Sequence, residues 1–291
     1  MFIPFVDRLN KKVEQIFIEL ESEKDIRKML KTDQEIKNYI VLKLAQNNLL
    51  LYTMLTHGRY HPTWAHELLC RKLDKVESGE IKRLIVIVCP RFGKSWLSSV
   101  TFPTYYLAKN NNHKFMAVSY NADLVSDFGR DARNIINSET YYDIWSLDRN
   151  TSEELKTIPI LSKESKAVSR FKLQNGSEYL GQGLGGGVTG RGGNVISCDD
   201  WVKSHLDLTG KKMDKDYEWY SSTLYNRQES CKIKGDAAFL VIQTHWHKKD
   251  LIGRLLADME SGKGDQWDVF HLQAQATKNE FYDKNEFYYY D

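Results

Sequence analysis

The sequence predicts an α/β fold in which helices cover a mostly parallel β-sheet. Four short runs are rich in β-branched and aliphatic residues without polar alternation, which is typical of strands buried on both faces. The runs are LIVIVC at 84–89, FMAVS at 115–119, NVISC at 194–198 and AAFLVIQ at 237–243. Segments with helical periodicity lie between them. Strands that alternate with helices favour crossover connections, and these produce a parallel sheet.

The chain before the first run is expected to be helical. Apolar residues at i, i+3, i+4 and i+7 form the stripe of an amphipathic helix. The first such stripe consists of Val13, Ile16, Phe17 and Leu20. A second helix begins near Ile36, and a third over residues 64–76 leads to Gly79, a residue typical of helix ends. We therefore expect residues 1–55 to form an N-terminal helical region.

Three further elements follow the first run. Residues 95–107 are expected to form a helix that is interrupted or ends near its proline, and residues 123–136 form another. Two short alternating runs within 167–181 flank Asn-Gly at 175–176. This dipeptide is typical of a tight hairpin turn, so the segment predicts an antiparallel pair of strands.

Charge and hydropathy exclude some classes of protein. The 41 basic and 39 acidic residues give a formal net charge of +2, so no global basic field attracts nucleic acid. Any DNA contact would come from a local patch or from an assembly. No apolar run approaches the roughly 18 residues that a membrane span needs, and the N-terminus lacks the apolar core of a signal peptide. We expect a cytoplasmic protein that makes no membrane contact.

A phosphate-binding loop is predicted between the first strand and the next helix. Gly93, Lys94 and Ser95 open that helix, where backbone N–H groups and the helix dipole favour an anion. Lys94 would reach the β- and γ-phosphates, and the Ser95 hydroxyl would bind Mg²⁺. The usual first glycine of such loops is Val88 here. The residues expected to contact ATP in this loop are Pro90, Arg91, Phe92, Gly93, Lys94, Ser95 and Trp96.

Arg91 lies inside this loop and has two interpretations. Its planar guanidinium suits phosphate oxygens, so it could act on the γ-phosphate within its own subunit. It could equally be a solvated surface arginine. The loop alone leaves both open.

An acidic pair, Asp199 and Asp200, ends the NVISC run. Parallel α/β sheets bind ligands at the carboxyl ends of their strands. We expect this strand beside the phosphate-loop strand, with Asp199 holding Mg²⁺ through water and Asp200 polarising the attacking water. The alternative is that the two aspartates form only a strand-ending turn.

Two other segments could complete the site. A loop dense in glycine surrounds Thr189 and Arg191 and leads into the acidic strand. Arg191 could neutralise charge on the γ-phosphate, in its own subunit or as an arginine finger in a neighbour, or the loop could be only a flexible surface segment. Thr244 follows the last run and could sense the γ-phosphate. We expect no metal site at His245 and His247.

Four segments follow one another along the chain: PRFGKS, SYNADL, GVTGRGGNVISCDDWVK and QTHWHKKDLIGRLL. Together and in this order they resemble the ATPase domain of terminase large subunits, the DNA-packaging motors of tailed bacteriophages. The resemblance covers residues 60–257. It implies a RecA-like (ASCE) P-loop sheet after an N-terminal helical region, and it places adenine near residues 60–66. It implies that Lys94 and Ser95 are the Walker A residues, with Arg91 as the arginine of that loop. Asp199 would be the Walker B acid and Asp200 the catalytic carboxylate. Arg191 would be a trans-acting finger, and Thr244 would begin the coupling motif. His245 stands where the family often has arginine.

The family also implies partners and a place of action. Its members use ATP and Mg²⁺ to translocate double-stranded DNA into a procapsid, as a homo-oligomeric ring with a portal ring and a small terminase subunit, in the cytoplasm of the infected host cell. We expect the ATPase domain at 56–257 and a linker at 258–291. Members usually carry a nuclease domain after that point, and we expect no nuclease activity from this chain.

Two other functions compete with a duplex translocase. One is a helicase-like ATPase of the same fold that acts on single-stranded nucleic acid. The other is a nucleotide-binding module without catalysis. The presence of Lys94, Asp199 and Asp200 together argues against the second.

Overall fold

The computed structural model describes residue 13 and residues 32–147, 157–163, 167–187, 190–204, 208–231, 235–273, 279–282 and 287–290. Apart from Val13, the first predicted amphipathic stripe lies outside these residues, and so does Thr189 of the glycine-rich loop. No helix in the described ranges is long and apolar enough to cross a membrane.

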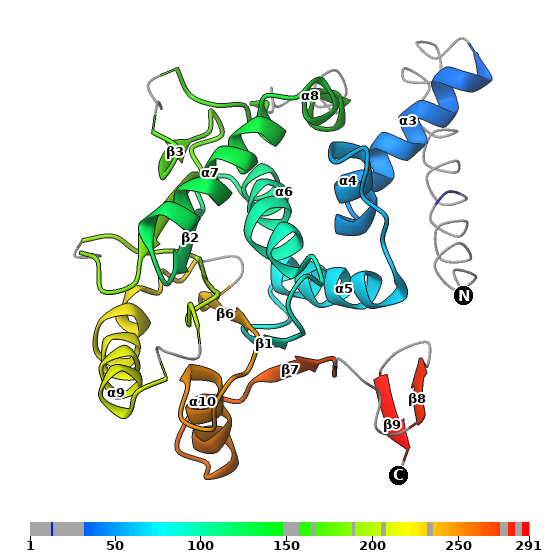
Figure 1. Ribbon diagram of the computed structural model, residues 1–291. Helices are drawn as coiled ribbons and strands as arrows, with labels where there is room; N and C mark the ends of the chain where they lie inside the picture. Colours follow the sequence, from blue (N-terminus) through cyan, green and yellow to red (C-terminus); the bar gives the residue numbers. More distant parts are fainter. Residues whose placement is uncertain are drawn as a thin grey trace.

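The centre of the molecule is a seven-stranded sheet with the order β3-β4-β2-β5-β6-β1-β7 (Figure 1). All neighbouring strands are parallel except β3 and β4. The strands are β1 (Arg83–Ile87), β2 (Lys114–Ser119), β3 (Arg170–Lys172), β4 (Glu178–Gly183), β5 (Val195–Asp199), β6 (Ala238–Gln243) and β7 (Asp268–His271). The mostly parallel α/β sheet predicted from the sequence is therefore confirmed.

The expected hairpin is the antiparallel pair β3 and β4. Gly176 has φ 83° in the turn between them, and the Asn175 side chain donates to the Leu107 carbonyl at 2.8 Å. The turn is thus tied to the end of α6 (Phe102–Lys109) as well as to its own strands. A separate antiparallel pair, β8 (Asn279–Tyr282) and β9 (Phe287–Tyr290), follows the main sheet.

Helices cover both faces of the sheet, and alternate residues of β1 show how. Leu84 and Val86 join one buried cluster, whereas Ile85 and Ile87 join the other. The first cluster packs under α4 (Leu49–Thr56), α5 (Trp64–Ser78), α6, α7 (Ala122–Ile136) and α8 (Glu139–Ser146), with α3 (Asp33–Ala45) beyond. The second packs under α9 (Gly210–Trp219), the turns Tyr220–Leu224 and Tyr225–Arg227, and α10 (Leu251–Glu260).

The strand order corrects one expectation about the site. The acid-bearing strand β5 does not lie beside the phosphate-loop strand β1, because β6 pairs in parallel with both. Every residue of β6 is buried, so this apolar strand is stabilised at the centre of the sheet rather than at an edge. An inserted strand between these two strands is the RecA-like (ASCE) arrangement, and the protein has this fold.

The helix after the phosphate loop also differs from a simple helix. It begins as a π-helical segment, Trp96–Thr101, and continues as α6. Pro103 lies in the first turn of α6. Proline has no backbone N–H, and this position tolerates that loss better than the helix interior does. The predicted interruption near this proline is therefore a change of helix type.

Segments on both sides of the predicted ATPase domain contribute to the main unit. Leu49, Leu50 and Tyr52 of α4 belong to the larger core, although residues 1–55 were expected to form a separate helical region. Residues 268–271, inside the expected linker, form β7 and pair with β1. The sheet thus extends beyond residue 257.

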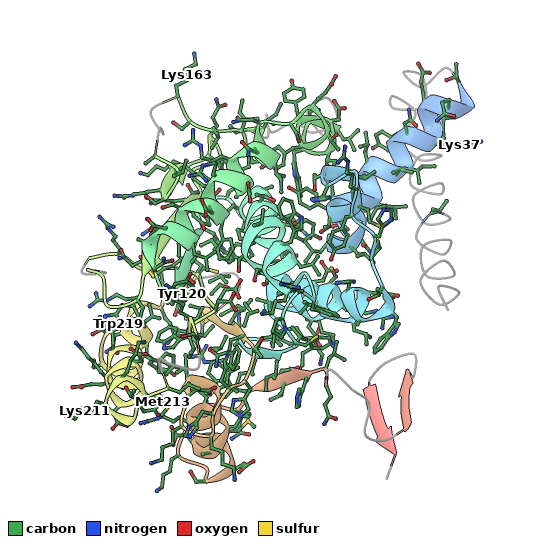
Figure 2. All side chains as sticks on the ribbon, viewed as in Figure 1. Lys37, Tyr120, Lys163, Lys211, Met213 and Trp219 are labelled. Carbon is green, nitrogen blue, oxygen red and sulfur yellow. The ribbon has the colours of Figure 1, made fainter. Side chains whose placement is uncertain are left out.

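Charged side chains are spread over the surface. Lys37, Lys163 and Lys211 extend toward solvent from three separate parts of the molecule (Figure 2). This distribution agrees with a chain of net charge +2.

Candidate nucleotide-binding site

The predicted phosphate loop and the predicted acidic pair meet at one edge of the sheet. The loop follows β1, and Asp200 follows β5, so both lie at the carboxyl ends of parallel strands. Lys94 Nζ lies 3.6 Å from Asp200 Oδ1, and the two side chains are 8% and 38% exposed. An ammonium group this well buried is stabilised by a nearby negative charge.

The loop takes a backbone conformation that few residues favour. Gly93 has φ 84° and Arg91 has φ 62°. Glycine adopts this left-handed region at little cost, whereas a residue with a Cβ is strained there by about 1–2 kcal/mol. Contacts from outside the loop must therefore hold it. One comes from Thr244, whose Oγ1 donates to the Val88 carbonyl at 3.1 Å.

Asp199 is buried beneath the loop, with 2% of its surface exposed. Its Oδ2 accepts a hydrogen bond of 2.6 Å from Ser99, whereas Oδ1 has no hydrogen-bond partner. Burial, and next the charge of Asp200, raise the pKa of Asp199 to about 7. The hydroxyls of Ser99 and Ser95 and the charge of Lys94 act in the opposite direction. A cation beside Oδ1 would relieve this unfavourable charge.

These residues fit Mg²⁺ as a ligand. The ion prefers oxygen atoms and usually keeps several water or phosphate ligands beside one or two carboxylates. Asp199 offers a carboxylate oxygen that no protein group occupies, and the Ser95 hydroxyl lies near it. Within the described residues, no group of three or more His, Cys, Asp and Glu side chains is placed to hold a metal ion by itself. The remaining ligands would then come from phosphate and water.

Asp200 directly follows β5 and faces Lys94. It has φ 47°, a conformation that aspartate tolerates better than most residues. Its N–H donates to the Ile242 carbonyl at 3.0 Å, and its own carbonyl accepts from Tyr120 N at 3.3 Å. The left-handed backbone and these two hydrogen bonds therefore fix Asp200 at the end of β5, with its side chain toward Lys94.

The two candidate arginines lie apart from this cluster. Arg91 and Arg191 are both exposed, and in the described residues neither forms a hydrogen bond or ion pair with Lys94, Asp199 or Asp200. Pro90 and Gly93 are exposed as well.

Aromatic rings surround the outer side of the loop. The Trp96 ring meets His57 edge-on at 4.5 Å, and the Phe92 ring stacks on His66 at 4.5 Å. Tyr60 contacts both histidines. Three buried polar atoms of this group, His57 Nδ1, Tyr60 Oη and Trp96 Nε1, have no hydrogen-bond partner. Tyr60 and His66, from the segment that the resemblance places near adenine, therefore lie on the outer side of the loop.

The segment after Thr244 is organised by Asp250, the N-cap residue of α10. Its carboxylate accepts from the backbone N–H groups of Trp246, His247 and Gly253, and lies 3.1 Å from His245 Nδ1. The hydrogen bond to Asp250 raises the pKa of His245 against the effect of burial. Burial would raise the pKa of Asp250, but these hydrogen bonds lower it.

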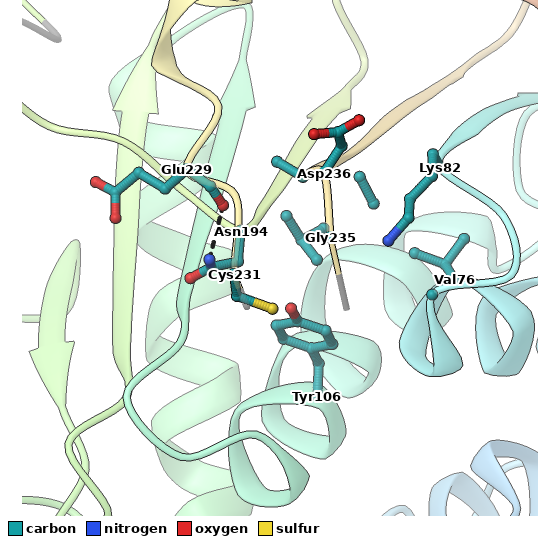
Figure 3. Close-up of a pocket in the computed structure, with 12 residues that line it drawn as sticks. Val76, Lys82, Tyr106, Asn194, Glu229, Cys231, Gly235 and Asp236 are labelled. Atoms are coloured by element: carbon teal, nitrogen blue, oxygen red, sulfur yellow. Dashed lines mark hydrogen bonds between the residues drawn. The ribbon is translucent and has the colours of Figure 1, made fainter. Parts of the chain in front are cut away.

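A pocket lies at the opposite edge of the sheet. Lys82, Asn194 and Ala237, which directly precede β1, β5 and β6, line it together with Tyr106 and Cys231 (Figure 3). The carboxyl ends of the strands point away from it, so it is separate from the phosphate loop.

Sequence reasoning missed Ser99, His66 and Gln243. Ser99 lies four residues after Ser95, a spacing that would have placed both hydroxyls on one helix face. Gln243 is buried at the end of β6 with neither side-chain amide atom hydrogen-bonded. No local pattern distinguishes it from other strand-ending residues.

Comparison with known proteins gives matches only among solved structures, since no family model and no curated protein matches the sequence. Two structures of the large terminase from a thermophilic bacteriophage, one with ADP and one with ATP-γ-S, align over 69% of this chain. Both alignments have 12% sequence identity and a TM-score of 0.34. They cover 44% and 43% of the terminase chains, so this chain spans less than half of their length.

Proposed function

We propose that this protein is a Mg²⁺-dependent ATPase whose hydrolysis drives double-stranded DNA into a phage procapsid, as in a terminase large subunit. The observation that carries the ATPase part is the 3.6 Å approach of Lys94 Nζ to Asp200 Oδ1. It joins a phosphate-loop lysine to a strand-end carboxylate across an inserted strand. The DNA-packaging part rests on the order of the motifs between residues 60 and 257.

Each residue of the cluster has a distinct role in this proposal. Lys94 and the backbone N–H groups at the helix start bind the β- and γ-phosphates. Asp199 and Ser95 would hold Mg²⁺, which when bound would offset negative charge on the phosphates. Asp200 is the more exposed carboxylate, so it orients the attacking water and accepts its proton.

The arginines and Thr244 would link this site to movement. Arg191 is exposed, so it is available to act on the γ-phosphate of a neighbouring subunit in a ring. Arg91 would act within its own subunit. Thr244 touches the loop through the Val88 carbonyl, and a shift of the loop after hydrolysis would be passed to β6 and α10. A portal ring and a small terminase subunit would be the protein partners.

The ATPase part is tested by steady-state phosphate release from the purified chain and its Lys94→Ala variant. We expect Lys94→Ala to abolish hydrolysis because the β- and γ-phosphates lose their cation. Lys211→Ala, which removes an exposed lysine on α9, should hydrolyse ATP like the wild type. Equal turnover of Lys94→Ala and the wild type would overturn the ATPase assignment.

The DNA part needs substrates that separate translocation from unwinding. A duplex translocase should displace the third strand of a triplex in an ATP-dependent reaction and leave the duplex intact. ATP-dependent displacement of one strand of a duplex, with stimulation by single-stranded DNA, would instead identify a helicase-like ATPase.

A further inference from the structure

We propose that His66 is a positioning residue for the phosphate loop, as a neutral imidazole that holds the Phe92 carbonyl and so sets the loop's shape for phosphate. This inference rests on the proposed nucleotide-binding function. His66 Nε2 lies 2.6 Å from the Phe92 carbonyl oxygen, and His66 Nδ1 lies 2.8 Å from the backbone nitrogen of Thr63.

These two partners determine the protonation state of the ring. A carbonyl oxygen can only accept, so Nε2 carries the hydrogen. A backbone N–H can only donate, so Nδ1 offers its lone pair to Thr63. Both contacts are satisfied only by the neutral Nε2–H tautomer, because a protonated ring would direct a second N–H at the Thr63 donor. Burial lowers the pKa of His66, which also favours the neutral ring, although the Phe92 carbonyl acts the other way.

The imidazole is itself well fixed. His66 lies in the first turn of α5 and is 8% exposed. Its ring stacks on the Phe92 ring with the planes 25° apart, and Tyr60 meets it edge-on at 5.6 Å. The donor is therefore placed by a helix that packs into the core, and not by the loop that it holds.

The contact acts where the loop is most strained. The Phe92 carbonyl lies between Arg91 and Gly93, which both have positive φ. In a trans peptide the C=O and the following N–H point in opposite directions. When His66 draws the Phe92 carbonyl toward α5, the Gly93 N–H is turned away from α5 and stays free for an anion. This chain has Val88 in place of the usual first glycine, and the Val88 carbonyl accepts a hydrogen bond from Thr244. The loop is therefore held from outside at both ends.

If His66 served only as a capping partner of α5, the contact with Thr63 would matter and the contact with Phe92 would not. Two substitutions separate these roles. In His66→Asn the side-chain oxygen can reach the place of Nδ1 and keep the Thr63 contact, but the donor to Phe92 is lost. In His66→Gln the side-chain nitrogen can reach the place of Nε2 and keep the donor to Phe92, but the Thr63 contact is lost.

The experiment measures the dissociation constants of a fluorescent ATP analogue and of its AMP counterpart, with thermal unfolding of each variant. We expect His66→Asn to bind the ATP analogue about three- to tenfold more weakly, as for the loss of one hydrogen bond. Its unfolding temperature should be close to that of the wild type. His66→Gln should bind the ATP analogue within about twofold of the wild type, even where its unfolding temperature is lower. The AMP analogue, which lacks β- and γ-phosphates, should show little difference among the variants.

Lys211→Ala, which changes an exposed residue of α9 outside the site, is the control and should behave like the wild type. Normal ATP binding by His66→Asn together with weak binding by His66→Gln would overturn the inference and leave His66 as a helix cap. If the wild-type chain binds neither analogue, the proposed nucleotide-binding function fails, which is a separate result.

Discussion

Two adjacent aspartates of this site have different surroundings, and this difference divides their chemistry. Asp199 is buried with one oxygen unpartnered, and burial raises its pKa to about 7. Asp200 is partly exposed and faces Lys94. A buried carboxylate with an oxygen that has no hydrogen-bond partner suits a cation, whereas an accessible carboxylate suits water. The assignment of Asp199 to the metal and Asp200 to catalysis therefore has a physical basis in burial.

Replacing Asp200 tests this division. Asp200→Asn should bind the ATP analogue as the wild type does, because Lys94 and the loop remain. Its turnover should fall by about 10²- to 10⁴-fold, since the amide cannot accept a proton from water. Binding is measured by fluorescence and turnover by phosphate release, with exposed Asp143→Asn on α8 as the control. A variant that fails to bind nucleotide would show that Asp200 supports the loop and not the chemical step.

Ser99 should orient the metal-side carboxylate. Ser99→Ala removes the 2.6 Å hydrogen bond to Asp199 Oδ2. Hydrogen bonds to charged groups contribute about 1.5–3 kcal/mol, so the Mg²⁺ concentration for half-maximal activity should rise about tenfold or more. Ser98→Ala is the matched control, because Ser98 Oγ donates to the Lys94 carbonyl, at 2.7 Å, and not to Asp199. An unchanged Mg²⁺ titration for Ser99→Ala would mean that Ser99 does not position Asp199.

Among the secondary-structure elements, β6 lies between the phosphate loop and α10 along one chain of contacts. Thr244, which directly follows β6, donates to the Val88 carbonyl, and Asp250 is the N-cap residue of α10. The segment between them is held by a single buried carboxylate that accepts three backbone N–H groups. The end of β6 is therefore mechanically tied to both the phosphate loop and α10.

The His245–Asp250 pair gives this segment a stability that depends on pH. Asp250 raises the pKa of His245 above its unfolded value of about 6.5. The contribution of the pair is then fully present below about pH 6.5 and is lost as the pH rises through the raised pKa. Asp250 stays ionised across this range because its pKa is lowered. His271, whose pKa is lowered by burial and then by the charge of His245, is the other titrating neighbour.

His245→Asn should therefore reduce the free energy of unfolding most at about pH 6 and least at about pH 9. Denaturant unfolding of the wild type and the variant at both values measures the difference, and the exposed control His61→Asn should show no such trend. A constant difference between the two pH values would indicate that the charge of His245 adds no stability.

At the scale of the whole molecule, the proposed arginine finger is not bonded to the proposed site within one chain. Arg191 is exposed, and within the described residues it makes no contact with the Lys94–Asp200 pair. Near-neutral net charge also gives the isolated chain no long-range attraction for DNA. Both features favour a function that is completed by assembly.

Arg191→Ala tests this view in mixed assemblies. An arginine finger contributes about 10³- to 10⁵-fold to turnover, so the pure variant should be nearly inactive. If the finger acts in a neighbouring subunit, ATPase activity should fall non-linearly as the variant fraction increases. A strictly proportional decrease would support a role within one subunit or no role. Lys211→Ala in the same mixtures should leave activity unchanged.

Much of the fold and part of the site could be predicted from local patterns. The four apolar runs all became central parallel strands, because residues that are apolar on both faces are stable only inside a covered sheet. The Asn-Gly turn and the helix end at Gly79, with φ 85°, also followed from conformations that few residues adopt. In contrast, β7 has the sequence DVFH, of which only Phe270 is buried, and no pattern identified it.

The sequence by itself determined which chemical groups are present and which strand end carries each, since both depend on residues close together in the chain. Only the tertiary structure decided that β6 separates β1 from β5, that Ser99 reaches Asp199, and that His66 reaches the loop from α5. These contacts join residues far apart in sequence. They depend on how crossovers pack against the sheet, and burial, which sets the pKa of Asp199, exists only after that packing has formed.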